Sequence, residues 1–249
     1  MERTNNCIIT GSGVYTPSET ISNEELVKAF NQYVDLNFKK EEREERYSKV
    51  DFIEKASGIK NRHPLNKSGL LNPKIMRTVV PTRKDNELSL QAELAVEAAK
   101  VALRQAKREA KEVDCVILSC SNLQRPYPNL AIEVQAVLGA KGFAYDMSLA
   151  CSSVTFAMMN AVGMIETNQA KCVLIVTPEI AGSQVDYTDR DSHFIFGDAA
   201  TALMLEHKDS AKVKEGFSII DSHLYTEFSN NIRTNFGFLN RVEKVGREA

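Results

Sequence analysis

The chain has 249 residues, of which 43% are hydrophobic and 26% are charged. These shares are close to globular averages and exclude a disordered tail or a fibre, and the length suits one large α/β domain or two small ones. The formal net charge of −2 argues against a nucleic-acid-binding surface, which needs clustered positive charge.

Neither a membrane segment nor an export signal is expected. The longest apolar runs, such as CVLIV at 172–176, are far shorter than the roughly 20 residues that span a bilayer. The opening residues MERTNNCIIT lack the basic and apolar regions of a signal peptide. The five cysteines are odd in number and have no paired spacing, which indicates a reducing compartment. We therefore expect a soluble cytoplasmic protein.

The first third of the chain mixes clear and weak signals. A short strand is predicted at 7–10, ending in GSGVYTP, where the glycines and the proline force a turn. Ser22 then offers an N-cap for a helix through Phe30. The run KKEEREER at 39–46 mixes charges at helical spacing, which is typical of a solvated helix face. Residues 65–82 carry prolines and a glycine with little periodicity and predict a loop or insertion.

The remaining elements alternate more regularly. The clearest helix is predicted at 89–110, where apolar residues repeat at three- and four-residue steps and form one stripe. Further helices are expected at 129–138 and 152–166. Strands are expected at 115–119, 143–147, 172–177, 200–206 and 217–225. Strands that are apolar throughout suit a sheet covered by helices on both faces, so the sequence predicts a layered α/β fold.

One segment, YDMSLACSSVTFAMMNAVGMIE at 145–166, carries chemistry. A strand ends at Met147 and a helix begins near Ser152, so Cys151 falls where the helix N-terminus presents unpaired N–H groups and partial positive charge. Such a position favours a thiolate and can hold a developing oxyanion. The residues alone leave a nucleophile and a buried structural thiol equally open.

The other four cysteines have a simpler interpretation. Each lies inside or at the edge of an apolar strand run, which favours buried structural thiols: Cys7, Cys115, Cys120 and Cys172. Cys115 and Cys120 lack the spacing of a metal-binding pair and have no neighbouring histidine, so no metal site is expected.

Several motifs stand in a fixed order along the chain: SGIKNRH (57–63), RPYPNLAIEVQAVLGAKG (125–142), ACSS around Cys151 and DRDSHFIFGDAATALML (189–205). With them the chain resembles the N-terminal part of a beta-ketoacyl-acyl carrier protein synthase III, a thiolase-fold condensing enzyme. The resemblance implies a thiolase-like layered α/β/α fold over residues 1–240, with the first half essentially complete and the second, pseudo-symmetric half missing. Residues 241–249 form a charged tail that does not match.

The resemblance also implies an activity. Cys151 would take an acyl group from acyl-CoA, and the acyl-enzyme would condense with malonyl-acyl carrier protein, with loss of carbon dioxide, to give a 3-oxoacyl product. The implied partners are acyl-CoA, acyl carrier protein and a second copy in a homodimer. No metal or tightly bound cofactor is implied, since CoA and phosphopantetheine arrive as substrate handles.

Particular positions match the family's substrate site. Tyr127 would reach across the homodimer interface towards the partner's acyl pocket, and Ile195 and Phe196 would line that pocket, although ordinary apolar packing explains all three equally well. Gly197 and Asp198, which follow Phe196 in the same motif, match a turn of the family that we interpret as structural.

Two departures concern the acyl donor. By position, the tryptophan and arginine that hold the CoA adenine in the family fall on Phe52 and Ala56. A phenyl ring can still stack, so Phe52 is a candidate substrate-binding residue, but the guanidinium is absent from position 56, and the donor would be held differently or would not be a short-chain acyl-CoA. The length of 65–82 resembles the subgroup that accepts medium-chain acyl groups.

A larger departure concerns the catalytic base. Family members continue into a half that supplies a histidine and an asparagine, whereas this chain ends in VEKVGREA. None of its four histidines is expected to replace that base: His63, His193, His207 and His223. We therefore expect slow acylation at Cys151 and poor or absent condensation.

Two alternatives stay open. The first is a related thiolase-fold acyltransferase of secondary metabolism, which would share the cysteine and differ in pocket shape. The second is a non-catalytic remnant that binds acyl chains or a partner carrying the missing half, because an apolar layer would otherwise lie uncovered.

Overall fold

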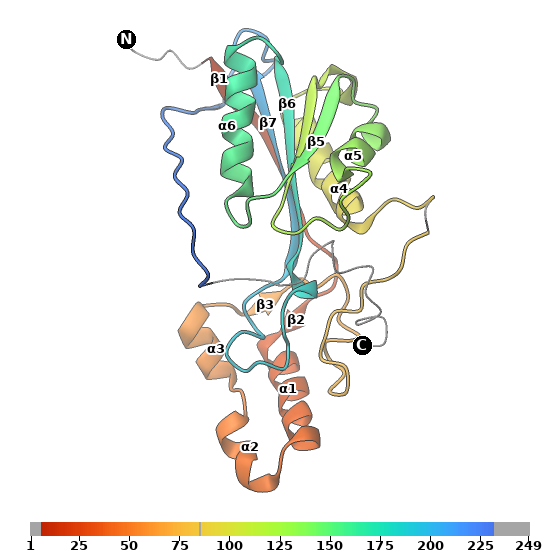
Figure 1. Cartoon of the computed structure of the whole chain (residues 1–249), viewed down its shortest axis with the longest axis vertical. Helices are drawn as coiled ribbons and strands as arrows, with labels where there is room; N and C mark the ends of the chain where they lie inside the picture. The colour runs from red at the N-terminus through yellow and green to blue at the C-terminus, as the bar shows by residue number, and fades with distance from the viewer. Residues whose placement is uncertain (1–5, 85, 232–249) are drawn as a thin grey trace.

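The computed structural model describes residues 6–84 and 86–231, and in it a layered sheet lies above a smaller helical unit (Figure 1). The sheet has the order β5-β4-β6-β7-β1-β8. Its strands are β1 (Cys7–Tyr15), β4 (Cys115–Ser119), β5 (Phe143–Met147), β6 (Cys172–Ile180), β7 (Asp198–His207) and β8 (Phe217–Ser218). Its helices are α4 (Leu90–Gln105), α5 (Leu130–Leu138) and α6 (Ser153–Glu166).

Helices cover both faces of this sheet. Strand β4 runs parallel to β5 and β6, while β7 runs antiparallel to β6 and β1. One apolar cluster joins α4 and α5 to one face, and a second joins α6 to the other. All five residues of β4 are buried, as expected for a strand enclosed by helices. The layered α/β prediction is confirmed.

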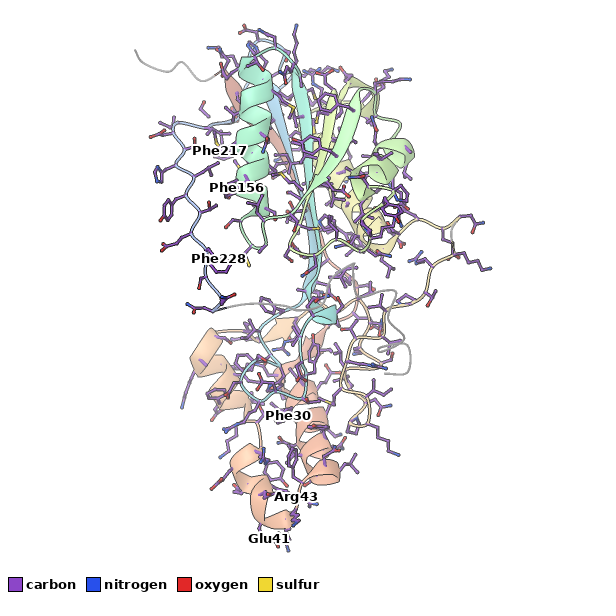
Figure 2. The ribbon with its side chains drawn as sticks, in the orientation of Figure 1. Phe30, Glu41, Arg43, Phe156, Phe217 and Phe228 are labelled. Atoms are coloured by element: carbon purple, nitrogen blue, oxygen red, sulfur yellow. The ribbon has the colours of Figure 1, made fainter. Side chains whose placement is uncertain are left out.

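The smaller unit is built from the N-terminal third of the chain. It contains β2 (Ile21–Ser22), α1 (Asn23–Asn37), α2 (Lys40–Arg46), α3 (Val50–Ser57) and β3 (Asn61–Arg62). Its core includes Phe30, labelled in Figure 2, and Ile53, together with Tyr187 and Phe194 from the segment between β6 and β7. Because that segment follows the carboxyl end of β6, this end of the sheet meets the helical unit.

Several predicted boundaries hold at residue level. Strands β4 and β5 match their predictions exactly, and α5 and α6 begin one residue later than predicted. Ser22 caps α1 as expected, in a capping box with Glu25, although the helix continues to Asn37. The charged run forms α2, which buries none of its residues. Residues 65–82 contain no helix or strand, which confirms the predicted loop.

Two predicted elements differ in extent. The first strand does not turn at GSGVYTP but continues to Tyr15, because its glycines let α4 pack directly on the strand: a Cβ on Gly11 would lie 2.3 Å from the Ala102 oxygen, and one on Gly13 would lie 2.0 Å from the Ala98 oxygen. The helix predicted to reach residue 110 ends at Gln105. Both glycines thus serve a tertiary contact.

The last predicted strand is also wrong in extent. Within 217–225, strand β8 covers Phe217 and Ser218, which lie opposite Ile9 and Ile8 of β1. The antiparallel register places Ile219 opposite Cys7, the first residue of β1, and carries the residues after Ile219 past the start of that strand. Residues 220–231 run as an exposed segment beside α6, where Figure 2 labels Phe228 on the segment and Phe156 on the helix.

Within the described residues, none of the helices has both the length and the apolar character needed to cross a bilayer. The predicted tail at 241–249, like residues 232–240 before it, lies outside the described residues.

Candidate active site

Cys151 occupies a tight turn between β5 and α6. The thiol-bearing residue is exposed and directly precedes Ser152, the N-cap of α6, while Ala150 before it adopts a left-handed φ of 49°. A non-glycine residue in this region is strained, and such strain is found where a side chain must be presented in one direction. The turn therefore displays Cys151 at the mouth of a helix.

Ser153 holds this turn in place. Its hydroxyl accepts a hydrogen bond from the Leu149 N–H at 2.7 Å and can donate to the carbonyl oxygens of Ala150, at 2.7 Å, and Cys120, at 3.1 Å. Ser148 also donates to the Ser121 oxygen at 3.2 Å. These bonds fix the Cys151 turn against the end of β4, at the carboxyl edge of the parallel strands, where open α/β sheets place their ligands.

The remaining four cysteines are sealed in the core, as predicted. Burial raises the pKa of each to about 12: Cys7, Cys115, Cys120 and Cys172. A thiol with such a pKa is protonated at neutral pH and is a poor nucleophile. Of the described thiols, only Cys151 is exposed.

Phe52 lies on α3, with 41% of its surface exposed. Its ring lies nearly perpendicular to that of Phe194, with 5.9 Å between centroids, and the Arg190 guanidinium carbon lies 5.8 Å from its centre. Arg190 donates from Nη1 to the Glu45 oxygen at 3.0 Å, and its buried Nε has no partner among the described residues. A guanidinium therefore lies beside the Phe52 ring, and it comes from the segment between β6 and β7. The family resemblance places this group at position 56, which is an alanine, and does not predict Arg190 as the neighbour of Phe52.

Ile195 and Phe196 are half-exposed on that same segment, at 44% and 52%. They precede Asp198, whose buried carboxylate accepts from Gly182 N at 2.7 Å and Leu65 N at 2.6 Å. Burial raises the pKa of this carboxyl, and the two N–H groups oppose the shift. The structural role predicted for Asp198 is consistent with these bonds.

Tyr127 lies on the loop between β4 and α5 and is 79% exposed. Arg125 braces this loop, donating from Nε to the Pro128 oxygen at 3.0 Å and pairing with Glu133 at 2.5 Å. Exposed apolar side chains continue from Tyr127 over α5 to the edge strand β5: Ile132, Val137 and Phe143. Tyr127 thus lies on the β4–α5 loop, whereas Ile195 and Phe196 lie on the segment between β6 and β7.

The histidines make their contacts away from Cys151. His63 Nδ1 lies 3.0 Å from the Pro17 oxygen, and His207 lies 3.8 Å from Asp209. His193 is fully buried, stacks on Phe30 at 4.5 Å and binds the Arg190 oxygen and Ser48. His223 is exposed on the extended segment. None of these four histidines hydrogen-bonds to the Cys151 thiol. Within the described residues, no group of three histidine, cysteine or acidic side chains is placed to hold a metal ion.

The chain resembles known proteins over most of its length. Residues 145–227 match the family model for 3-oxoacyl-[acyl-carrier-protein] synthase III. A beta-ketodecanoyl-[acyl-carrier-protein] synthase of Pseudomonas aeruginosa is 53% identical over 195 residues, which are 78% of this chain and 56% of that protein. A beta-ketoacyl-[acyl-carrier-protein] synthase III of Dinoroseobacter shibae is 34% identical over 81% of this chain and 52% of that protein. The chain thus spans about half the length of these curated relatives.

Solved structures share the fold. The 3-oxoacyl-[acyl-carrier-protein] synthase III of Aquifex aeolicus superposes with a TM-score of 0.60 at 29% identity, covering 80% of this chain and 53% of that one. The corresponding enzyme of Pseudomonas aeruginosa gives a TM-score of 0.63 at 23% identity, covering 86% and 54%, and shows the fold alone. The thiolase-like α/β/α prediction is confirmed.

Proposed function

The chain belongs to the 3-oxoacyl-[acyl-carrier-protein] synthase III family, and from this premise we propose that Cys151 accepts an acyl group from acyl-CoA for condensation with malonyl-acyl carrier protein. The observation that carries the proposal is that Cys151 is exposed at the mouth of α6, while the other four thiols are buried. Sγ would attack the thioester carbonyl, forming a new C–S bond as the bond to CoA breaks. CoA would leave as a thiol with the proton that Cys151 loses.

Condensation then returns the cysteine. Loss of carbon dioxide from the malonyl group leaves an electron pair that forms the new carbon–carbon bond to the acyl carbon, and Cys151 departs and regains a proton. Since none of the four histidines contacts Cys151, we propose that the described residues carry acylation and that condensation uses a base and an enolate-stabilising group from outside them.

The relative that is 53% identical is named for a ten-carbon product. Condensation adds two carbons, so we propose an eight-carbon acyl donor for this chain. The half-exposed apolar residues Ile195 and Phe196 would line the acyl pocket, and the long 65–82 loop would adapt it to a medium chain.

Phe52 and Arg190 would hold the CoA adenine. A purine fits against the exposed phenyl face, and a guanidinium beside an aromatic system adds a favourable electrostatic contact. The guanidinium missing at Ala56 would thereby be replaced from a different element.

A homodimer forms part of the proposal. Within the part of the chain that the structure describes, strand β5 lies at the edge of the sheet and pairs only with β4, and edge strands with apolar side chains favour pairing with another chain. Tyr127, beside it, would reach the partner's acyl pocket. The cytoplasmic location expected from the sequence fits five free thiols.

Intact-mass measurement after incubation with octanoyl-CoA tests the function. We expect one octanoyl adduct on the wild-type chain and none on Cys151→Ala. Cys120→Ala is the matched control, because that thiol is buried, and it should acylate like the wild type. No adduct on the wild type, or one that survives in Cys151→Ala, would refute the proposal. Rapid 3-oxodecanoyl formation by this chain alone would refute the need for outside groups.

A further inference from the structure

Asp198 joins the start of β7 to two other segments of the chain, 63–65 and 180–182. It begins β7 opposite Ile180, the last residue of β6. Its carboxylate receives hydrogen bonds from Gly182 N and Leu65 N, and its own N–H donates to the His63 oxygen at 2.6 Å. Only 1% of the surface of Asp198 is exposed. Its buried hydrogen bonds therefore tie the sheet to the helical unit.

The tie extends into the 65–82 loop through Thr78. The Thr78 hydroxyl donates to the Gly182 oxygen at 3.0 Å, so Gly182 is held on its N–H by Asp198 and on its carbonyl by the loop. The space around Gly182 is filled: a Cβ there would lie 3.0 Å from Asp198 Oδ1 and 3.2 Å from both Thr78 Oγ1 and the Tyr187 hydroxyl. A packed and fully bonded junction of this kind transmits displacement rather than absorbing it.

Both tied segments carry exposed apolar side chains. Val79 and Val80 follow Thr78 directly and are half-exposed, as are Ile195 and Phe196 immediately before the Gly197–Asp198 turn. Gly197 admits no side chain freely, since a Cβ would lie 3.1 Å from His63 N. The position of Ile195 and Phe196 relative to the 65–82 loop is therefore set at Asp198.

Resting on the proposed function, we infer that Asp198 is a positioning residue that sets the length of acyl chain accepted at Cys151. It would do so by holding the 65–82 loop and the Ile195–Phe196 pair at a fixed separation. An apolar pocket discriminates between acyl lengths only while its walls stay in place, and each methylene that loses its contact weakens the selection.

Asp198→Asn tests this inference with little change in volume. The new amide presents its NH₂ group to a backbone N–H, so one of the two bonds from Gly182 or Leu65 is lost. We expect the ratio of Cys151 acylation rates with octanoyl-CoA and acetyl-CoA to fall about tenfold. Hydrogen exchange of amides at 65–82 and 195–197 should rise together. Thr78→Val, which loses the hydroxyl bond to Gly182 and the hydrogen bond with the Tyr187 side chain but keeps both bonds to Asp198, should shift the ratio in the same direction by less.

Asp114→Asn is the matched control. Asp114 also accepts two backbone N–H bonds, from Lys171 at 2.7 Å and Cys172 at 3.0 Å, but both on Oδ2 and at the amino end of β4 and β6, so its amide variant removes a charge while the amide oxygen can keep both bonds. The Asp114→Asn variant should leave unchanged the ratio of acylation rates with octanoyl-CoA and acetyl-CoA (the acyl-length ratio) and the hydrogen exchange of 65–82 and 195–197.

The outcomes separate the inference from the function it rests on. Absence of any Cys151 adduct on the wild type refutes the proposed function and the inference with it. A normal adduct, with faster exchange in Asp198→Asn but an unchanged acyl-length ratio, refutes the inference alone and makes Asp198 purely structural. If Asp198→Asn does not fold, Thr78→Val takes its place in the test. An unchanged ratio of octanoyl-CoA to acetyl-CoA acylation rates in folded Thr78→Val then refutes the inference.

Discussion

The Arg190 guanidinium lies 5.8 Å from the centre of the Phe52 ring, although 137 residues separate the two in the sequence. Phe52 lies on α3 and Arg190 on the segment between β6 and β7, and Phe194 of that segment makes a T-shaped contact with the same ring. The helical unit and the carboxyl end of the sheet thus meet at an exposed aromatic face beside a positive charge.

Removing either side of this pair should weaken donor binding. We expect Phe52→Ala or Arg190→Ala to raise the KM for octanoyl-CoA about fivefold to tenfold, since one contact of this type contributes about 1 kcal/mol. The control is an octanoyl thioester of N-acetylcysteamine, which has no nucleotide. Acylation rates with that thioester should not change, and an equal loss with both donors would place Phe52 and Arg190 outside nucleotide binding.

The exposed apolar patch on α5 and β5 should control self-association. Val137→Lys places a charge among Tyr127, Ile132 and Phe143, and sedimentation equilibrium should show a dimer for the wild type and a monomer for the variant. Val14→Lys, at an exposed residue near the end of β1, provides the control and should remain dimeric. A wild-type chain that is monomeric at tens of micromolar would contradict the homodimer.

Buried His193 should make stability depend on pH. Burial lowers its folded-state pKa to about 4, below the unfolded value of about 6.5, so between these values the unfolded chain binds more protons. The free energy of unfolding should therefore be highest above pH 6.5 and fall by up to about 3 kcal/mol as the pH drops to 4. Urea unfolding at pH 7, 6 and 5 measures this slope, and His193→Gln should flatten it. An unchanged slope in the variant would assign the effect to other groups.

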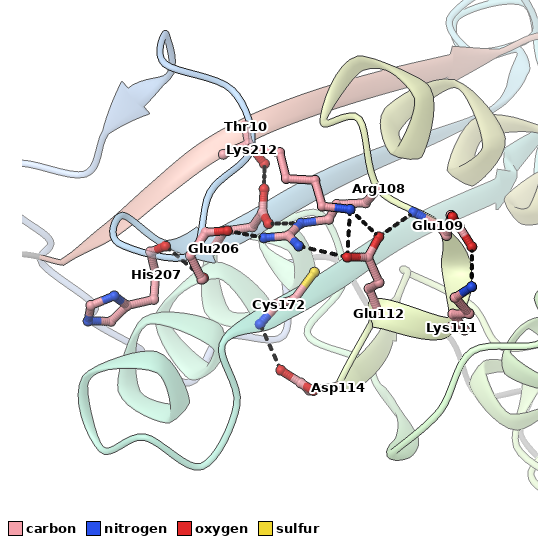
Figure 3. A network of polar contacts seen from close by, with 11 residues as sticks. Thr10, Arg108, Glu109, Lys111, Glu112, Asp114, Cys172, Glu206, His207 and Lys212 are labelled. Carbon is pink, nitrogen blue, oxygen red and sulfur yellow. Dashed lines mark hydrogen bonds and ion pairs between the residues drawn. The ribbon is translucent and has the colours of Figure 1, made fainter.

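The ion network at the end of β7 should stabilise the fold, so removing one partner of a buried pair should lower the free energy of unfolding. Figure 3 shows the Arg108 guanidinium between Glu112 and the fully buried Glu206, which also accepts from Thr10. Arg108→Met should lower the unfolding free energy by about 3–5 kcal/mol, because it leaves Glu206 buried and unpaired. Arg108→Met with Glu206→Leu should recover most of that loss.

An exposed ion pair calibrates this measurement. Lys100→Met breaks the pair with Glu97 on the outer surface of α4 and should cost less than about 1 kcal/mol. If Arg108→Met costs no more than Lys100→Met in urea unfolding, the buried network does not stabilise the fold.

Local sequence patterns predicted the elements whose limits are local. Strand β4 is an apolar run with polar residues at both ends, so its limits could be predicted from the sequence. The start of α1 could be predicted as well, because Ser22 and Glu25 form a capping-box pattern. The extension of β1 through Gly11 and Gly13 could not, because its cause is the approach of α4. The end of β8 at Ser218 likewise follows from a register that only the assembled sheet defines.

The candidate site divides in the same way. The place of Cys151 could be predicted, because a cysteine between an apolar strand and a helix is a local pattern, while its role as the nucleophile stays a prediction. The neighbours of that site come from tertiary contacts: Arg190 beside Phe52, and Asp198 bonded to Gly182 and Leu65. An arginine and an aspartate in a loop have many local explanations, and nothing in the sequence names their partners.

Peptide mass spectrometry after a short incubation with octanoyl-CoA measures the central claim most directly. The five cysteines compete within one molecule, so the four buried thiols act as internal controls. We predict that the octanoyl group is found on the peptide that contains Cys151 and that the other four cysteines stay unmodified. An octanoyl group distributed among several cysteines, or confined to any residue other than Cys151, would contradict the account.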